Sequence, residues 1–268
     1  MNSAVKSIDS TQDVRRRVGA AEWEARVQLA ACYRLAAHYG WTDLIYTHIS
    51  ARVPGPENHY LLNPFGMMFH EITASGLVKI DVEGNIIDPT PHTIHKAGFV
   101  IHSAIHAARE DAHCVIHSHT RAGMAVSMMK CGLLPLTQHA MLFHGRVGYH
   151  DSEGFALETD ERRRLAANLG DKCILMLRNH GTLVAGSSVP EAFSMMWHLE
   201  KAMQAQVDAM ASGQELSLPP AAVAESTARM GFTGATLPQY ADGRSPLGRM
   251  EWPGLVRMLD AMDPSYRN

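Results

Sequence analysis

The chain has few cysteines, and their arrangement argues against two classes of protein. No pair has the Cys-x-x-Cys spacing in the 268 residues, so neither a disulfide-stapled secreted scaffold nor a thiolate zinc site is expected. Most lie within apolar runs, which predicts reduced core residues of a cytoplasmic protein. The sixteen histidines direct any metal chemistry towards imidazole nitrogen. The four cysteines are Cys32, Cys114, Cys131 and Cys173.

Long apolar runs and positive charge are lacking as well. No stretch is long and apolar enough to span a bilayer, and the polar N-terminal segment lacks the apolar centre of a signal peptide. The formal net charge is −3, without a dense basic run, so the sequence predicts neither a nucleic-acid partner nor a membrane partner. We therefore expect a cytoplasmic protein that acts on a small molecule.

The most informative stretch runs from Cys114 to Thr120, with the sequence CVIHSHT. Its first three residues are apolar and rich in β-branched side chains, which predicts a short buried strand. His117 and His119 follow two positions apart, and side chains at i and i+2 of a strand point to the same face. Both imidazoles can therefore bind one ion.

A second stretch, Cys173 to Gly186 (CILMLRNHGTLVAG), has the same form and carries His180 after its apolar run. A lone histidine in a core is usually a hydrogen-bonding residue. If the two strands are neighbours, however, His180 joins His117 and His119 as a third neutral nitrogen donor. Three protein ligands and one open position are typical of a catalytic metal site, whereas structural zinc sites close their coordination shell. The sequence therefore predicts a catalytic divalent metal.

Hydrophobic periodicity predicts helices and short strands in a layered α/β arrangement. Serine, proline and glutamate at the start of 188–211 form a capping box with proline in the first turn. The early strands are joined by turns, which favours antiparallel pairing. The segment 138–151 fits neither pattern clearly. Besides the two histidine stretches, we expect strands at 43–53 and 59–63, a hairpin at 77–87, and helices at 20–39, 93–109, 122–129, 159–169, 188–211 and 255–262.

No internal repeat or low-complexity linker divides the chain, so we expect one principal domain. Residues 1–18 are an N-terminal lead-in, and 19–212 form the domain. Residues 213–268 are a C-terminal extension, rich in proline, glycine and alanine, that packs on the domain or on a neighbouring subunit. The expected fold is an α/β three-layer αβα sandwich with a mainly antiparallel central sheet.

The segments THISARVPG, NPFG, the helix before CVIHSHT, and LRNHGTLVAG together resemble the class II aldolase/adducin family, from about Ala20 to Ala211. The resemblance implies an αβα sandwich and a homotetramer with active sites at subunit interfaces. In the family's sugar-phosphate aldolases, three histidines that match His117, His119 and His180 hold zinc, which stabilises an enediolate. The resemblance therefore implies a divalent ion here, zinc foremost, with manganese and iron as alternatives.

Other positions depart from that aldolase pattern. The aldolases carry Ser-Ser-Glu on the helix before the first two ligands, for phosphate binding and acid/base catalysis, where this chain has Lys96 to Gly98 (KAG). Their Gly-Asn, which precedes a Val-Ser pair in the early strand, corresponds to Thr47 and His48 before Ile49 and Ser50, and their proton-donating tyrosine falls near Gln138. The metal ligands are thus kept, whereas the phosphate pocket and the catalytic glutamate are replaced.

Two histidines are candidates for the proton transfer that the missing glutamate leaves open. His102 lies four residues after Gly98, on nearly the same face of the predicted helix. His48 lies on the early strand, and an imidazole can both give and take a proton. A rival interpretation has His102 orienting a ligand imidazole. The residues that we predict to contact substrate are Lys96, Phe65, Gly66 and Gln138.

Three functions fit these residues. The first is a metal-dependent lyase, either a decarboxylase or an aldolase-type enzyme, that cleaves a carbon–carbon bond in a non-phosphorylated hydroxy carboxylate, for instance a hydroxylated aromatic acid. The second is a non-haem iron oxygenase on the same three histidines, because three imidazoles do not distinguish zinc, manganese and iron. The third is an adducin-like, non-catalytic interaction module, which need not keep all three ligands.

Overall fold

The computed structural model describes residues 11–268, apart from 56–57, 155–159, 235–241 and 243. Its seven-stranded sheet has the order β3-β2-β1-β4-β7-β6-β5. Every neighbouring pair is antiparallel except β5 and β6, which are parallel. The prediction of a mainly antiparallel sheet is therefore confirmed. The strands are β1 (His48–Arg52), β2 (Tyr60–Leu62), β3 (Val78–Ile80), β4 (Cys114–Ser118), β5 (Val147–His150), β6 (Ile174–Leu177) and β7 (Gly181–Gly186).

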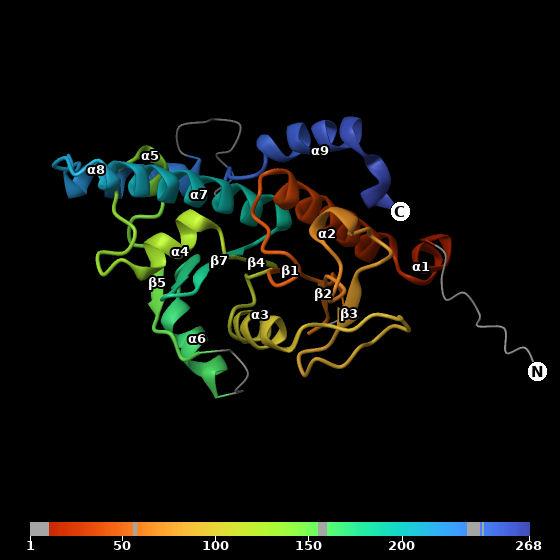
Figure 1. Cartoon of the computed structure of the whole chain (residues 1–268). Helices are drawn as coiled ribbons and strands as arrows, with labels where there is room; N and C mark the ends of the chain where they lie inside the picture. Colours follow the sequence, from red (N-terminus) through yellow and green to blue (C-terminus); the bar gives the residue numbers. More distant parts are fainter. Residues whose placement is uncertain (1–10, 56–57, 155–159, 235–241, 243) are drawn as a thin grey trace, which may run out of the picture.

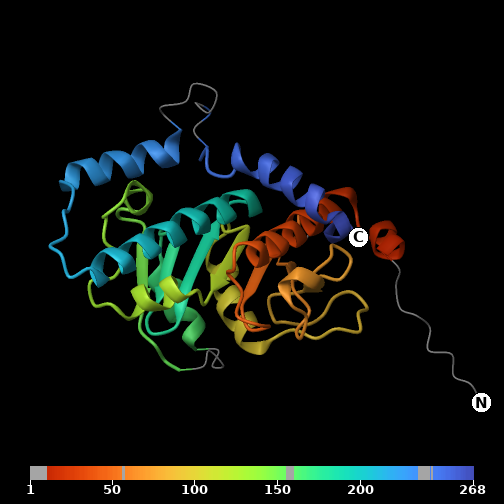
Figure 2. The ribbon, with the colours of Figure 1, turned by 45° about the horizontal axis from the view of Figure 1, so that its top comes forward.

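Helices cover both faces of this sheet, as Figures 1 and 2 show. On one face lie α2 (Ala20–His38) and α7 (Val189–Ala211), and on the other lie α3 (Lys96–Ala108) and α6 (Glu161–Leu169). The predicted three-layer αβα sandwich is therefore confirmed. The remaining α-helices of the described residues are α1 (Thr11–Arg17), α4 (Arg121–Met128), α5 (Gln138–Met141), α8 (Ala221–Thr233) and α9 (Glu251–Met262).

The alternation of side chains along β4 explains why the sheet has a core on each face. Cys114 and Ile116 belong to the core under α2 and α7, whereas Val115 belongs to the core under α3 and α6. A strand buried on both faces therefore reads as one continuous apolar run. By the same alternation His117 points towards the α3 side of the sheet, which places the first metal-ligand candidate there.

Most predicted helices are present, with ends shifted by a few residues, but the strands are shorter than predicted. The strand expected at 43–53 begins only at His48, because the chain turns before it and Leu44 has a φ of 47°. The hairpin expected at 77–87 keeps β3 and a single bridge between Ile80 and Ile86. The helix expected from 159 begins at Glu161, and 155–159 lie outside the described residues.

Some features were not predicted. The segment 138–151 contains α5 and β5, and residues 221–233 form α8. The lead-in contains α1, while its first ten residues lie outside the described part. Cys131 is exposed, so it is not the core residue that its surroundings in the sequence suggested. Within the C-terminal extension, α8 packs on α5, and α9 packs on α2 and α7.

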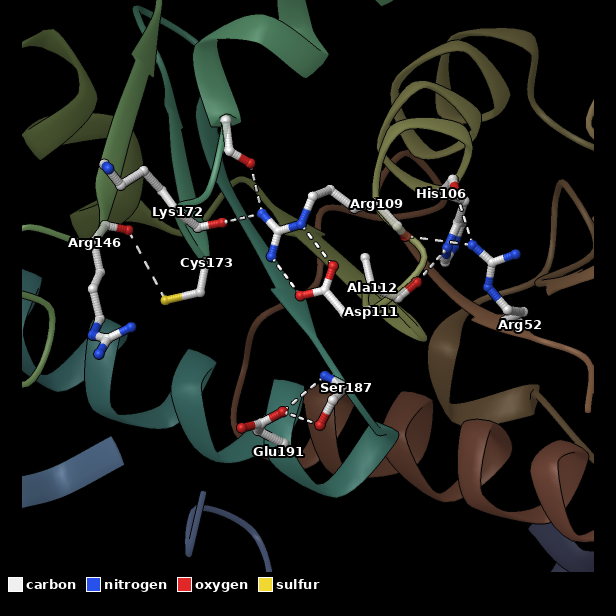
Figure 3. A network of polar contacts seen from close by, with 11 residues as sticks. Arg52, His106, Arg109, Asp111, Ala112, Arg146, Lys172, Cys173, Ser187 and Glu191 are labelled. Atoms are coloured by element: carbon white, nitrogen blue, oxygen red, sulfur yellow. Dashed lines mark hydrogen bonds and ion pairs between the residues drawn. The ribbon is translucent and has the colours of Figure 1, made fainter. Parts of the chain in front are cut away.

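The start of α7 agrees with the predicted capping box in its serine half. The Ser188 hydroxyl accepts a hydrogen bond from the backbone N–H of Glu191. The Glu191 carboxylate, however, accepts from the backbone N–H and the hydroxyl of Ser187, as Figure 3 shows. Among the residues that the structure describes, no helix is both long enough and apolar enough to cross a membrane.

Candidate metal centre

His117, His119 and His180 converge at one end of the sheet. Strand β4 pairs with β7, and this pairing brings the turn before β7 beside the end of β4. The Nε2 atoms of His117 and His119 face each other at 2.9 Å, and one nitrogen of each of the three rings lies within 4.8 Å of the others. The predicted neighbourhood of the two histidine stretches is therefore confirmed. His180, however, does not end a strand, because it lies in the turn between β6 and β7.

Two residues beside His180 explain this local fold. Asn179 has a φ of 59°, a left-handed conformation that asparagine tolerates. A Cβ atom on Gly181 would lie 2.4 Å from the carbonyl oxygen of Ser118 and 3.1 Å from Cδ2 of His119. Only glycine lets β7 pass this close to the end of β4. The Arg-Asn-His-Gly sequence is thus the turn that carries the third imidazole to the first two.

The outer nitrogens of two ligand candidates are already hydrogen-bonded. Nδ1 of His117 donates to the carbonyl oxygen of Thr182 at 2.9 Å, and Nδ1 of His119 donates to the Asp43 carboxylate at 2.8 Å. Each imidazole is thereby held with its Nε2 atom directed at that of its neighbour. Metal-binding histidines almost always have such a partner on the other ring nitrogen.

Burial keeps the imidazoles of His117 and His180 neutral, which is the metal-binding form. Burial lowers the pKa of His117 well below its ordinary value, and His180 and His119 beside it lower it further. Burial, with His119 close by, lowers the pKa of His180 to about 4. The donor set, the protonation and the bonded outer nitrogens therefore all fit a divalent ion.

A cavity of about 600 Å³ opens beside the three histidines. Its described lining contains no arginine or lysine side chain, and Asp43 is the one carboxylate there. The cavity is therefore suited to a substrate with an apolar body and a few polar groups. Apart from the ligand candidates, the wall is formed chiefly by Asp43, Tyr46, His48, His95, Ile101 and Asn179.

His48, one of the two predicted proton-transfer residues, lies in this wall. Its side chain is buried, and neither ring nitrogen has a hydrogen-bond partner. Its ring stacks on His95, with centroids 5.2 Å apart. Burial lowers the pKa of His48 to about 3, with His95 contributing, so the ring is neutral. A buried polar group without a partner requires an explanation, and a ligand in the cavity supplies one.

His102, the other predicted proton-transfer residue, does not line the cavity. Its ring lies behind His48, with centroids 5.9 Å apart and planes nearly perpendicular. Its Nδ1 atom is 2.6 Å from the Ser50 hydroxyl oxygen. The helical spacing from Gly98 placed His102 near the site, but it is not among the residues that form the cavity wall.

None of the four predicted substrate contacts is among the described residues that line the cavity. The Phe65 ring lies 4.8 Å from that of His95, with Gly66 next to it in a turn. Gln138 begins α5, which packs on α7 and α8, and it does not line the cavity. Lys96 is the first residue of α3, and its side chain lies outside the described part.

Asp43 is a residue of the candidate site that the sequence did not reveal. It lies 76 positions before His119 in the chain, within a segment that we expected to be a strand. No spacing or motif links the two residues, so only the folded chain shows the pair.

A family model described as "Class II Aldolase and Adducin N-terminal domain" matches residues 27–207. The chain belongs to this family. An aldolase II superfamily protein from Pseudomonas syringae has a structure with a TM-score of 0.87 and 50% identity, covering 95% of this chain and 99% of that one. Class II aldolases generally use a divalent metal, often zinc, which agrees with the three-histidine centre.

Two further relatives point to different functions within the family. The structure of an L-fuculose 1-phosphate aldolase from Glaciozyma antarctica has a TM-score of 0.80 and 26% identity, covering 97% of this chain and 96% of that one. Alpha-adducin of Rattus norvegicus is 43% identical over 241 residues, which are 88% of this chain and 33% of the adducin. Family membership therefore shows the fold and the aldolase relationship, but not a particular substrate.

Proposed function

We propose that the protein is a metal-dependent carbon–carbon lyase that acts on a non-phosphorylated hydroxy carboxylate, by decarboxylation or by aldol cleavage. The observation that carries the proposal is the set of three convergent imidazoles beside an open cavity, two of them with their outer nitrogens hydrogen-bonded. Such a site leaves room for substrate, as catalytic metal sites do.

His117, His119 and His180 would hold the ion, for which zinc is our first choice and manganese or iron the alternatives. When bound, the metal would act as a Lewis acid on the substrate oxygens and stabilise the negative charge that develops on bond cleavage. Asp43 keeps the His119 ring in place through its Nδ1–H. A substrate hydroxyl and carboxylate next to each other suit such an ion, because both are oxygen donors.

His48 is the residue of this chain that we place at the reacting atoms. It lines the cavity, it is neutral, and neither of its nitrogens has a hydrogen-bond partner, so one of them can bond a ligand. A neutral imidazole has one N–H donor and one acceptor, so it can pass a proton to or from a substrate oxygen or carbon. In this proposal His102 supports His48 from behind rather than touching substrate.

The cavity wall supports a planar, partly apolar substrate. His95 stacks on His48, and Tyr46 and Ile101 also form the wall. Aromatic side chains favour stacked or edge-on ring partners. A hydroxylated aromatic acid fits this wall and also carries the hydroxyl and carboxylate that the metal would bind.

The test is a screen of hydroxy acids for released carbon dioxide or aldehyde, with protein loaded separately with zinc, manganese and iron. We expect turnover with a divalent metal, loss of turnover in His48→Asn, and normal turnover in the exposed control variant His70→Asn. Iron-dependent oxygen consumption would instead favour the oxygenase. Absence of turnover with every metal and every acid would contradict the lyase.

The likeness to alpha-adducin favours a second candidate, a non-catalytic interaction module. The complete three-histidine centre and its bonded outer nitrogens argue against it, because an interaction module has no need of them. Metal content separates the two: a protein purified without metal, which takes up none on titration with zinc, would support the module.

We further propose a homotetramer with active sites at subunit interfaces, in keeping with the family. Tyr46, which lines the cavity, is 48% exposed, and Leu44, two positions earlier in the chain, is 63% exposed. Exposed apolar side chains gathered in one place mark contact surfaces.

A further inference from the structure

A buried chain of hydrogen bonds runs behind the cavity, through residues that the proposed reaction does not use directly. Nδ1 of His102 lies 2.6 Å from the Ser50 hydroxyl oxygen, and that oxygen lies 2.7 Å from Nε2 of His106. Nδ1 of His106 lies 2.8 Å from the carbonyl oxygen of Ala112, a contact visible in Figure 3. All three side chains are almost completely buried, at 0–2% exposure.

The carbonyl at one end determines where every proton of this chain lies. A carbonyl oxygen only accepts, so Nδ1 of His106 must carry a proton. In a neutral ring Nε2 of His106 is then an acceptor, and the Ser50 hydroxyl must donate to it. Having used its one proton, the hydroxyl accepts from Nδ1–H of His102. His102 is thereby left with an unprotonated Nε2. Burial lowers the pKa of both histidines far below the ordinary value, so both rings are neutral.

Contacts with neighbouring residues hold His106 in this arrangement. The His106 ring stacks on the Tyr60 ring, with centroids 4.5 Å apart. The Arg52 guanidinium donates to the backbone carbonyl of His106 at 2.7 Å, which fixes the last turn of α3 to β1 (Figure 3). Ser50 itself lies on β1, two residues after His48, on the same face of the strand.

Three buried nitrogen atoms without a hydrogen-bond partner belong to the two rings at the other end of the hydrogen-bond chain, whose centroids are 5.9 Å apart with planes nearly perpendicular. They are Nε2 of His102 and both nitrogens of His48. In a neutral His48 one of these carries a proton and the other does not. The unprotonated Nε2 of His102 can accept a hydrogen bond from the N–H of His48. The second His48 nitrogen is then left for a ligand in the cavity.

We propose that Ser50, His102 and His106 form a one-way hydrogen-bond chain that presents the unprotonated Nε2 of His102 to His48, so that His102 is a positioning residue that sets the tautomer and orientation of His48. The inference rests on the proposed function in one respect, namely that His48 faces a substrate. The proton assignments of the chain do not depend on it.

The test is residue-resolved nitrogen NMR of the histidines in the zinc-loaded full-length protein, compared with a Ser50→Ala variant. We expect the wild-type His102 to carry its proton on Nδ1. In Ser50→Ala this preference should be lost, and the His48 signals should shift with those of His102. The matched control is Ser103→Ala, because the buried Ser103 hydroxyl bonds only the carbonyl oxygen of Val100; it should change neither ring.

A second variant tests the direction of the chain. His106→Leu removes the acceptor at the far end and frees the Ser50 hydroxyl to donate to His102, so the His102 proton should move to Nε2. Where the lyase assay gives turnover, Ser50→Ala should lower kcat about tenfold with KM and zinc content unchanged. A wild-type His102 protonated on Nε2, or His48 signals indifferent to Ser50→Ala, would overturn the proposal. If the spectra are as expected but no acid is turned over, the proposed lyase function is wrong and the proposed hydrogen-bond chain is still supported.

Discussion

The His48 ring of β1 fills the space that a side chain on Gly98 of α3 would need. A Cβ atom on residue 98 would lie 2.6 Å from Cδ2, Cε1 and Nε2 of the His48 ring, closer than real Cβ atoms come to any neighbour. In the sugar-phosphate aldolases that this chain resembles, the corresponding pair is a glutamate on the helix and an asparagine on the strand. In this chain the His48 ring on the strand therefore requires glycine at position 98 of the helix.

Gly98→Ala should consequently destabilise the protein, although alanine favours a helix. Helix propensity alone would stabilise by up to about 1 kcal/mol, whereas forcing an extra methyl group into a packed site costs about 1–3 kcal/mol. We expect a net loss of roughly 1 kcal/mol in the free energy of unfolding, measured with urea, together with reduced turnover because His48 must move.

Gly254→Ala is the matched control for that change. Gly254 is also within a helix, α9, and its added Cβ would meet only a guanidinium nitrogen of Arg257, at 3.8 Å. This variant should be as stable as the wild type or slightly more stable. Equal effects of the two substitutions would show that helix propensity, and not the His48 ring, governs residue 98.

Asp43→Asn should weaken metal binding without removing a ligand. The carboxylate accepts from Nδ1–H of His119, which holds the ring and raises its basicity. An amide keeps an acceptor but loses the charge, so we expect about a tenfold weaker zinc affinity, measured by competition with a chelator. Asp208→Asn, an exposed change on α7, should leave the affinity unaltered.

His119→Ala should strip the metal and keep the fold. Full metal occupancy retained in this variant would count against the three-histidine centre.

The metal-free protein should lose stability on mild acidification. Burial lowers the pKa of His106 to about 3, from an ordinary value of 6.5 that applies in the unfolded chain. Above pH 6.5 both states are neutral and the group has no effect. Below it the unfolded chain takes up the proton and the folded chain does not. The free energy of unfolding therefore falls as the pH drops from about 6.5 towards 3, by up to about 1.4 kcal/mol per pH unit.

Urea unfolding at a series of pH values checks this expectation, with His106→Phe as the test variant. Its stability should fall less steeply between pH 6 and pH 4.5, because one buried neutral histidine has been removed. Replacing the exposed His70 should leave the slope as it is. A wild-type free energy that stays constant over this interval would contradict the buried neutral state.

The features that could be predicted are those encoded within a short stretch of sequence. The i, i+2 spacing of His117 and His119 requires only strand geometry. The contact between Asp43 and His119 depends on how a loop returns to the sheet, 76 positions away, and leaves no local pattern. His102 shows the same limit: its helical position was right, but its bond to Ser50, across 52 positions, decides which way it acts.

Light scattering at micromolar concentration should give the mass of a tetramer. The physical reason is the exposure of Leu44 and Tyr46 beside the cavity, since water contact of such side chains is relieved by a subunit interface. Leu44→Asp should shift the protein towards smaller species, whereas Met262→Asp, at the exposed end of α9, should not. A monomeric wild type would rule out the proposed assembly.

Sugar phosphates should be poor substrates, despite the structural likeness to an L-fuculose 1-phosphate aldolase. The described cavity wall has no arginine or lysine side chain for a phosphate, and Gly98 provides no carboxylate. Loss of a general acid or base costs about 10²–10⁴-fold, so L-fuculose 1-phosphate should be cleaved at least about a hundredfold more slowly than the best hydroxy acid, as measured by aldehyde release.

Gly98→Glu alone should not restore cleavage, because the His48 ring fills the space. Combining it with His48→Asn makes that space available, and the double variant should cleave the phosphate faster than Gly98→Glu does. Efficient cleavage by the wild type would show that another residue supplies the missing carboxylate.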